Sequence, residues 1–211
     1  MKNLFLLVFG VFGFIITSSS QNIDFGVKAG VNFATITGDY TDDVKGRTAF
    51  HIGAVAEVEI NEKFSIQPEL LYSAQGFKTE YKDSGSDWSE KDEVTVKLDY
   101  INVPIIAKYY VIEGLSIEAG PQIGFLISAE QDYKYTYTDA GETYSESGTE
   151  DVKEYLKTID FGLNFGVGYK MKNGLNFGAR YNLGLSNIND IEGIDDKNQN
   201  SVFQVSVGYW F

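Results

Sequence analysis

The side chains with the greatest potential for chemistry are few, and they begin with His51. It is the only histidine and the chain has no cysteine, which excludes multi-histidine metal sites, cysteine-ligated zinc and cysteine nucleophiles. A histidine beside a serine or an aspartate can activate a nucleophile, and both residue types are common in the neighbouring segments. The alternative is a hydrogen-bonded structural histidine. We favour that alternative and expect no enzyme activity, no metal and no cofactor.

A second candidate is the run from Asp196 to Asn200, which carries oxygen-bearing side chains at alternate positions, as calcium-binding loops do. Two features argue against calcium. Ser201 stands where such a loop has a glycine, and no glutamate closes the site. A solvated turn is therefore the preferred interpretation of this run.

The elements that must position these residues are eight segments in which apolar and polar residues alternate, the pattern of strands with one apolar face. They lie at about 25–33, 50–60, 64–73, 101–110, 115–125, 159–170, 175–186 and 202–211. Long connections (38–47, 76–93, 129–157, 187–200) alternate with short turns (61–63, 112–114, 172–174). Long loops on one side and tight turns on the periplasmic side are typical of membrane barrels. The sequence predicts an all-β fold, an eight-stranded antiparallel up-and-down transmembrane β-barrel.

The face that meets lipid follows from the composition of the strands. A soluble eight-stranded barrel, such as a lipocalin, would put its apolar face inside and a charged face in water. Here the polar face is rich in Gly, Asn, Ser and Gln, and glycine suits the crowded interior of a small barrel. We therefore expect Leu163 and Val207 to face lipid, and Asn164 and Gln204 to face the lumen.

The N-terminal residues 1–20 have the features of a secretory signal peptide. Lys2 precedes an apolar run from Leu4 to Ile16, and small residues up to Ser20 offer a cleavage site before Gln21. The run is shorter than the roughly 20 residues of a membrane-spanning helix; a buried core segment is the alternative. The sequence thus predicts an outer-membrane barrel domain of residues 21–211, released by cleavage near Ser20 and Gln21.

The charge balance limits the partners. Thirty acids against seventeen Lys and Arg give a net charge of −13, which argues against nucleic acid. The acidic long connections 76–93 and 129–157 are candidate sites for an unknown extracellular ligand. Tyrosines supply contact area at low entropic cost, and the second connection contains Tyr133, Tyr135, Tyr137, Tyr144 and Tyr155. The alternative is strand extension beyond the membrane, which the spacing of the first three favours.

The predicted lumen carries a nearly balanced set of charges, for which we expect ion pairs. The acids are Glu57, Glu59, Glu69, Glu118 and Asp160, and the bases are Lys28, Lys108, Lys170 and Arg180. The short turn at Glu113 places Lys108 opposite Glu118, and a loop centred near 42–43 places Lys28 opposite Glu57. Because an unpaired buried charge is costly, a balanced set predicts a packed, poorly conducting lumen; water-filled gaps are the alternative.

One segment breaks the alternation. Apolar residues lie at even positions from Val94 to Tyr100 and at odd positions from Ile101 to Tyr109. A slip of one residue moves every side chain to the other face. The pattern predicts one of two features. Either a β-bulge lies near 99–102, or the segment with apolar residues at even positions, 94–100, lies above the membrane.

Residues 25–33 (FGVKAGVNF) and residues 100–109 (YINVPIIAKY) carry a family resemblance that extends over the whole mature chain. They are similar to the opening strand and to the Tyr-Leu-Glu-Ile-Pro-Leu-Leu-Leu-Lys-Tyr motif of the PorT-like outer-membrane β-barrel family of Gram-negative Bacteroidota. Asn102 replaces the usual Glu and Ala107 a Leu, which puts a Glu-dependent lumen role in doubt but not the fold. The resemblance implies an eight-stranded, porin-like small barrel, in a family whose members mostly lack an assigned activity.

We therefore expect an integral outer-membrane protein with a structural or surface-interaction role. Its partners are outer-membrane lipid and the barrel assembly machinery, because Tyr209 and Phe211 end the last strand with the aromatic pattern that the machinery recognises; an ordinary edge strand is the alternative. A narrow porin-like channel for small solutes is the second hypothesis, and a rim enzyme using His51 is the third.

Overall fold

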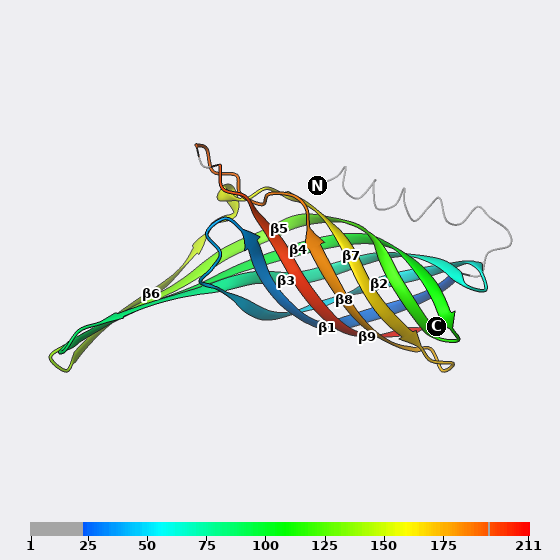
Figure 1. Ribbon diagram of the computed structural model, residues 1–211, viewed down its shortest axis with the longest axis horizontal. Helices are drawn as coiled ribbons and strands as arrows, with labels where there is room; N and C mark the ends of the chain where they lie inside the picture. The colour runs from blue at the N-terminus through cyan, green and yellow to red at the C-terminus, as the bar shows by residue number, and fades with distance from the viewer. Residues whose placement is uncertain (1–22, 194) are drawn as a thin grey trace.

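A computed structural model describes residues 23–193 and 195–211 as one antiparallel sheet, in which eight strands close into a barrel (Figure 1). The strands are β1 (Ile23–Gly38), β2 (Val44–Asn61), β3 (Phe64–Ser84), β4 (Trp88–Ile112), β5 (Leu115–Asp139), β6 (Glu142–Asp151), β7 (Ile159–Lys170), β8 (Leu175–Gly184) and β9 (Asn198–Trp210). Neighbours along the chain pair with each other except β6 and β7; β5 pairs with β7, and β9 pairs with β1. The predicted fold is confirmed. The predicted signal peptide, residues 1–20, lies outside the described residues.

The two ends of the barrel differ. Tight turns join β2 to β3, β4 to β5 and β7 to β8 at one end, which we call the short-turn end. Gly114 and Gly174 stand in two of these turns with φ of +81° and +87°, a left-handed backbone that glycine adopts without strain. Phe211 lies at the same end, where its N–H donates to the Phe25 carbonyl at 2.9 Å. Both ends of the described chain are therefore tied into the barrel at one rim.

The wall of the barrel has an apolar outside and a polar inside. Val207 is 46% exposed and Leu163 is partly exposed, whereas Asn164 and Gln204 are buried. The predicted facing of all four residues is confirmed. Period-2 alternation in strands explains this result, because successive side chains point to opposite faces.

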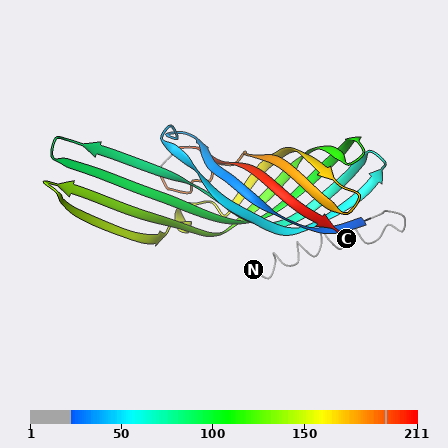
Figure 2. The ribbon, with the colours of Figure 1, turned by 90° about the horizontal axis from the view of Figure 1, so that it is seen from below.

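The opposite end departs from expectation at residues 76–93, where a loop is predicted but most residues form strands. At residues 129–157 the favoured interpretation, strand extension beyond the membrane part of the barrel, is confirmed for most residues. The outer parts of these strands make a four-stranded extension, which we call the projecting sheet (77–84 of β3, 88–97 of β4, 130–139 of β5, and β6). It leaves the barrel as a twisted arm (Figures 1 and 2). β-branched and aromatic residues favour strands here, and Ala140 and Gly141, with φ of 46° and 89°, make the two-residue hairpin turn.

The predicted irregularity near 99–102 is present in the pairing of β4 with β5, whereas the pairing of β4 with β3 is unbroken. That strand keeps one register with β3, from the pair of Tyr109 with Phe64 out to Ser89 with Ser84. Its even residues, Val96 to Lys108, are buried throughout. The irregularity lies in the facing strand β5, where Asp99 pairs with Ser128 but Tyr100 pairs with Leu126, which leaves Ile127 as the extra residue. The apolar pattern changes phase because the lumen itself becomes apolar toward the projecting sheet.

Within the described residues, helical structure is short. A single 3-10 turn, Lys153–Tyr155, follows β6. No helix in this part of the chain has the length and apolar character needed to cross a membrane.

Candidate functional site: a filled lumen and a projecting sheet

The centre of the lumen holds a buried ion-pair network around Arg180 and Glu69. Arg180 donates to Glu69 through both terminal nitrogens, at 3.0 and 2.9 Å, and to Glu118 at 3.0 Å. Lys28 Nζ lies 3.1 Å from Glu69 Oε2. All four side chains are at least nine-tenths buried. The fork of the guanidinium fits a carboxylate at two points, so this network fixes strands across the lumen.

A second part of the network continues toward the short-turn end. Lys108 Nζ lies 3.2 Å from Glu57 and 3.9 Å from Glu118, which joins the two parts. Lys170 Nζ lies 3.4 Å from Glu57 and 2.7 Å from Asp24. Tyr110 also donates to Glu57. Four bases and four acids thus neutralise each other inside the barrel.

The register decides which predicted pairs form. Lys108 lies opposite Glu118, as the short turn between β4 and β5 required. The predicted pair of Lys28 with Glu57 is wrong. In the β1–β2 hairpin Lys28 lies opposite Gly53, and Glu57 lies opposite Asp24, because the five-residue connection shifts the centre of the loop and a long loop sets register weakly.

Three acids depart from the sequence interpretation. Glu59 is expected in the lumen network, but it is exposed at the short-turn end and makes no ion pair within the described chain. Asp160 is buried but accepts from Ser186 at 2.6 Å and Asn200 at 2.9 Å instead of pairing with a base. Asp24 lies outside the predicted first strand, which begins at Phe25. Asp24 stands four positions before Lys28, and residues separated by an even number of positions in a strand share a face. This spacing is the sequence signal that places Asp24 on the lumen face.

His51 lies inside the barrel in a layer of amide side chains. It is 1% exposed, and its Nδ1 lies 2.8 Å from Asn32 Oδ1. Asn32 also donates to Ser73 at 3.0 Å and accepts from Gln204 at 2.9 Å. The other ring nitrogen, Nε2, has no hydrogen-bond partner among the described residues. The His51 ring is therefore closed off from solvent inside the barrel.

An apolar plug closes the lumen below the projecting sheet. Its members are Ile36, Val96, Leu98, Tyr100, Leu126, Ala129 and Ile188. The Tyr100 hydroxyl accepts from Asn200 at 3.1 Å, which links the plug to the polar lumen. The cavity left beside Arg180 measures about 10 Å³, about the space that one water molecule needs. Buried side chains thus occupy the lumen at the ion-pair network and at the apolar plug.

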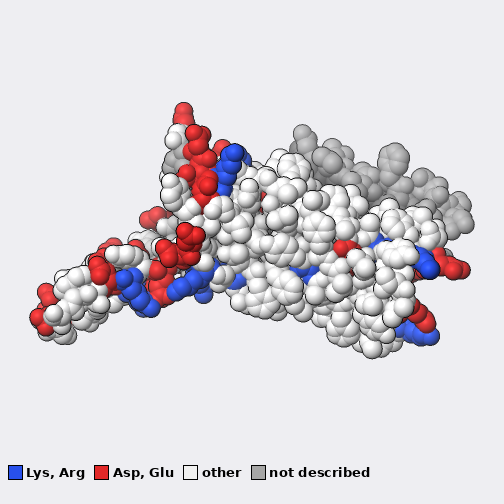
Figure 3. Space-filling view, viewed as in Figure 1, with Lys and Arg blue, Asp and Glu red and all other residues white. Residues whose placement is uncertain are grey.

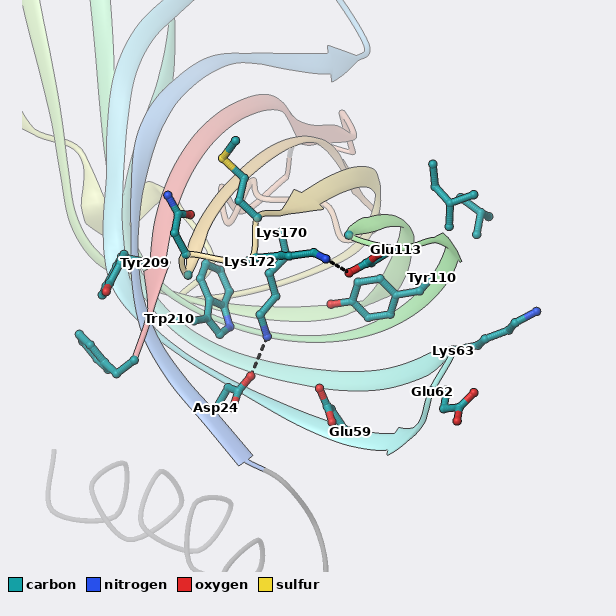
Figure 4. A pocket seen from close by; sticks show the side chains of 17 residues that line it. Asp24, Glu59, Glu62, Lys63, Tyr110, Glu113, Lys170, Lys172, Tyr209 and Trp210 are labelled. Atoms are coloured by element: carbon teal, nitrogen blue, oxygen red, sulfur yellow. Dashed lines mark hydrogen bonds and ion pairs between the residues drawn. The ribbon is translucent and has the colours of Figure 1, made fainter.

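The short-turn end opens into a hollow of about 850 Å³ (Figure 4). Lys170 reaches across it to Asp24, and Tyr110 and Trp210 point toward it. Trp210 is only 4% exposed, and its ring lies 5.7 Å from Lys108 Nζ. The hollow therefore ends at the ion-pair network and has the shape of a vestibule.

The candidate calcium run is used for contacts within its own loop and with the neighbouring one. The Asp196 carbonyl accepts from Asn187 at 3.1 Å and from Asn189 at 3.0 Å, and Lys197 N–H donates to Asp39 at 2.9 Å. Across the described residues, no three His, Asp or Glu side chains gather as metal ligands.

The outer face of the projecting sheet carries exposed ion pairs. Glu80 lies 2.5 Å from Lys45 and 3.7 Å from Lys91, and it also contacts Lys82. Hydrogen bonds from Lys45 and Lys82 lower the pKa of the Glu80 carboxyl to about 2. Lys97 pairs with Asp132 nearby. Charge is thus balanced on this face.

The predicted assembly signal forms the end of the barrel wall. Tyr209 is 46% and Phe211 is 76% exposed. Their rings meet edge to face, with centroids 5.8 Å apart. Both are presented outward, next to β1.

Two comparisons find known proteins that are similar to this chain. The sequence matches the outer membrane protein beta-barrel domain over residues 18–190, whereas the curated proteins gave no match. Among solved structures, Neisserial surface protein A is 14% identical, with 90% of this chain and 99% of that chain covered and a TM-score of 0.48. Ail of Yersinia pestis is 13% identical (89% and 98% covered, TM-score 0.42). A major outer membrane protein of Thermus thermophilus is 14% identical (90% and 100% covered, TM-score 0.42). The chain belongs to the outer-membrane protein β-barrel domain family.

Proposed function

We propose that this outer-membrane barrel is a non-conducting anchor that presents the projecting sheet for surface interactions. The observation that carries the proposal is the filling of the lumen by the ion-pair network and the apolar plug. A barrel of eight strands has room for side chains and little else. A porin-like channel would need an open path where Arg180 and Leu98 lie, and an enzyme at the rim would need His51 to be accessible.

The orientation follows from the two ends. Membrane barrels of this kind have short turns in the periplasm and long loops outside the cell. The short-turn end then faces the periplasm, and the projecting sheet stands outside the cell. Tyr209 and Phe211, at the periplasmic rim, support recognition by the barrel assembly machinery, and outer-membrane lipid covers the apolar wall.

We also propose that the chain belongs to the PorT-like group of outer-membrane barrels. The support for this assignment is the sequence of two strands: residues 25–33 in β1 and residues 100–109 in β4. Asn102, which replaces the usual Glu, is buried in the lumen. The proposed surface role is independent of that position, since it concerns residues 88–97 of β4, in the projecting sheet.

Orientation is tested by labelling single cysteines on intact cells. The chain has no native cysteine, so Ser145→Cys in β6 and Asn173→Cys in a short turn are the only labelled sites in their variants. A membrane-impermeant maleimide should label Ser145→Cys on intact cells, and Asn173→Cys only after the outer membrane is opened. The reverse order would place the sheet in the periplasm and overturn the proposed function.

A further inference from the structure

The two faces of the projecting sheet differ in chemistry, and the register shows how. Residues that lie opposite each other, such as Tyr81, Asp92, Tyr135 and Glu146, share one face. This inner face continues the lumen-facing rows of β3 and β4. Two contacts agree with the assignment: the Tyr133 ring covers Gly148, and the Tyr144 hydroxyl donates to Glu146 at 3.2 Å.

The inner face combines aromatic rings with acids. Its aromatic residues besides Phe77 are Tyr81, Trp88, Tyr133, Tyr135, Tyr137 and Tyr144. Its acids are Asp83, Glu90, Asp92, Asp139, Glu142, Glu146 and Glu150. Within the four segments of the projecting sheet, no Lys or Arg lies on this face.

The outer face of the projecting sheet differs from the inner face in its charge. It carries the bases Lys78, Lys82, Lys91, Lys97 and Lys134 and the acids Glu80, Glu93, Glu130, Asp132 and Asp151. These charges balance, and several form ion pairs, such as Lys91 with Glu93 at 2.7 Å. The rest of this face is mainly Ser and Thr. Figure 3 shows acidic and basic side chains side by side over this arm of the molecule. The excess negative charge of the sheet is thus confined to the aromatic inner face.

We infer that the inner face binds an extended, Lys- and Arg-rich segment of a partner protein, an inference that rests on the proposed surface role. Charge complementarity favours a positively charged segment, because the carboxylates of the inner face have no basic neighbours on the same face of the described sheet. The tyrosines and Trp88 add ring faces that attract ammonium and guanidinium groups. Anionic glycans are repelled by the same field, and so is the inner face of a second copy of this chain.

The size of the face favours a segment over a folded domain. Nine residues of β5, 131–139, span about 30 Å, and four strands span about 15 Å at their usual spacing. The area given by these two lengths is well below the roughly 800 Å² per partner of a stable interface between folded proteins. An extended segment with basic residues at alternate positions would place them over successive inner-face acids.

The test is direct binding of a labelled peptide that alternates Lys and Thr to the refolded full chain, followed by fluorescence anisotropy. A Glu–Thr peptide of equal length is the control. One variant removes inner charges (Glu90→Gln, Asp92→Asn, Glu146→Gln). A matched variant removes the same number of outer charges (Glu93→Gln, Glu130→Gln, Asp132→Asn). Heat-dependent gel migration confirms that each variant is folded.

We expect the inner variant to weaken binding by about tenfold, roughly 0.5 kcal/mol per charge, and the outer variant by less than about twofold. Tyr135→Ala should cost about threefold. Equal losses in both charge variants, equal binding of the Glu–Thr peptide, or no binding of the Lys–Thr peptide would overturn the inference. These outcomes leave the surface role intact if Ser145→Cys is labelled from outside, whereas labelling from the periplasm alone overturns that role whatever the peptide does.

Discussion

Glu69 and Glu80 make the same kind of contact in two very different regions. Glu69, in the lumen, accepts from Arg180 and Lys28 with no solvent exposure of its side chain, whereas Glu80, on the projecting sheet, meets several lysines in water. Removing one partner of a buried pair leaves a costly unpaired charge, but exposed pairs contribute little. The comparison indicates that the ion pairs in the lumen stabilise the barrel. The exposed pairs neutralise the outer face of the projecting sheet, whereas the inner face stays acidic.

The largest expected effect separates these two glutamates. Glu69→Ala should destabilise the barrel by about 3–5 kcal/mol, because Lys28 and one side of Arg180 lose their partner. Glu80→Ala should leave the unfolding midpoint unchanged within error. Urea unfolding in lipid vesicles measures both. Equal effects of the two substitutions would remove the distinction between the regions.

The apolar plug gives the next effect. Leu98 has no exposed surface, so Leu98→Ala should cost about 2–5 kcal/mol through lost burial and a new cavity. Tyr144→Ala, at a site that is 58% exposed on the sheet, should change stability by less than about 0.5 kcal/mol. The same unfolding assay applies. A small loss at Leu98 would show that the plug is loosely packed.

The outer wall can be compared with the sheet by adding a charge. Val205 is 47% exposed on the barrel wall, where an Arg should cost about 2–4 kcal/mol if the wall faces lipid. Ser145→Arg on β6 carries the same charge into water and should cost nothing measurable. Refolding yield and unfolding midpoint in vesicles report the difference. A tolerated Val205→Arg would mean that this wall is not in the bilayer.

The smallest effect is the titration of the exposed pairs. Lys45 and Lys82 hold the pKa of Glu80 at about 2, below its ordinary value of 4.5. Because the folded pKa is lowered, any stabilisation by this carboxylate is present above pH 4.5 and is lost as the pH falls toward 2. Carbon NMR at low salt should give a Glu80 midpoint near 2, which Lys45→Gln raises. A midpoint of 4.5 in the native chain would contradict the pairing.

Much of this account could be predicted from the sequence, and the remainder could not for physical reasons. Alternation determines which face Leu163 and Asn164 occupy, and the short turn determines the pair of Lys108 with Glu118, because a tight turn leaves one register. The pair of Lys28 with Glu57 failed because the β1–β2 loop allows several registers. The projecting sheet is hard to predict, since its polar strands lack a buried face and show little periodicity outside residues 133–137.

The central claim is that the barrel is sealed and that the projecting sheet carries the function. Current through single wild-type barrels in planar bilayers tests it most directly, with heat-dependent gel migration as proof of folding. The account predicts no steady conductance above the leak of the bare bilayer. A stable, ion-selective current from the folded wild-type protein would contradict it and would identify the lumen as a pore.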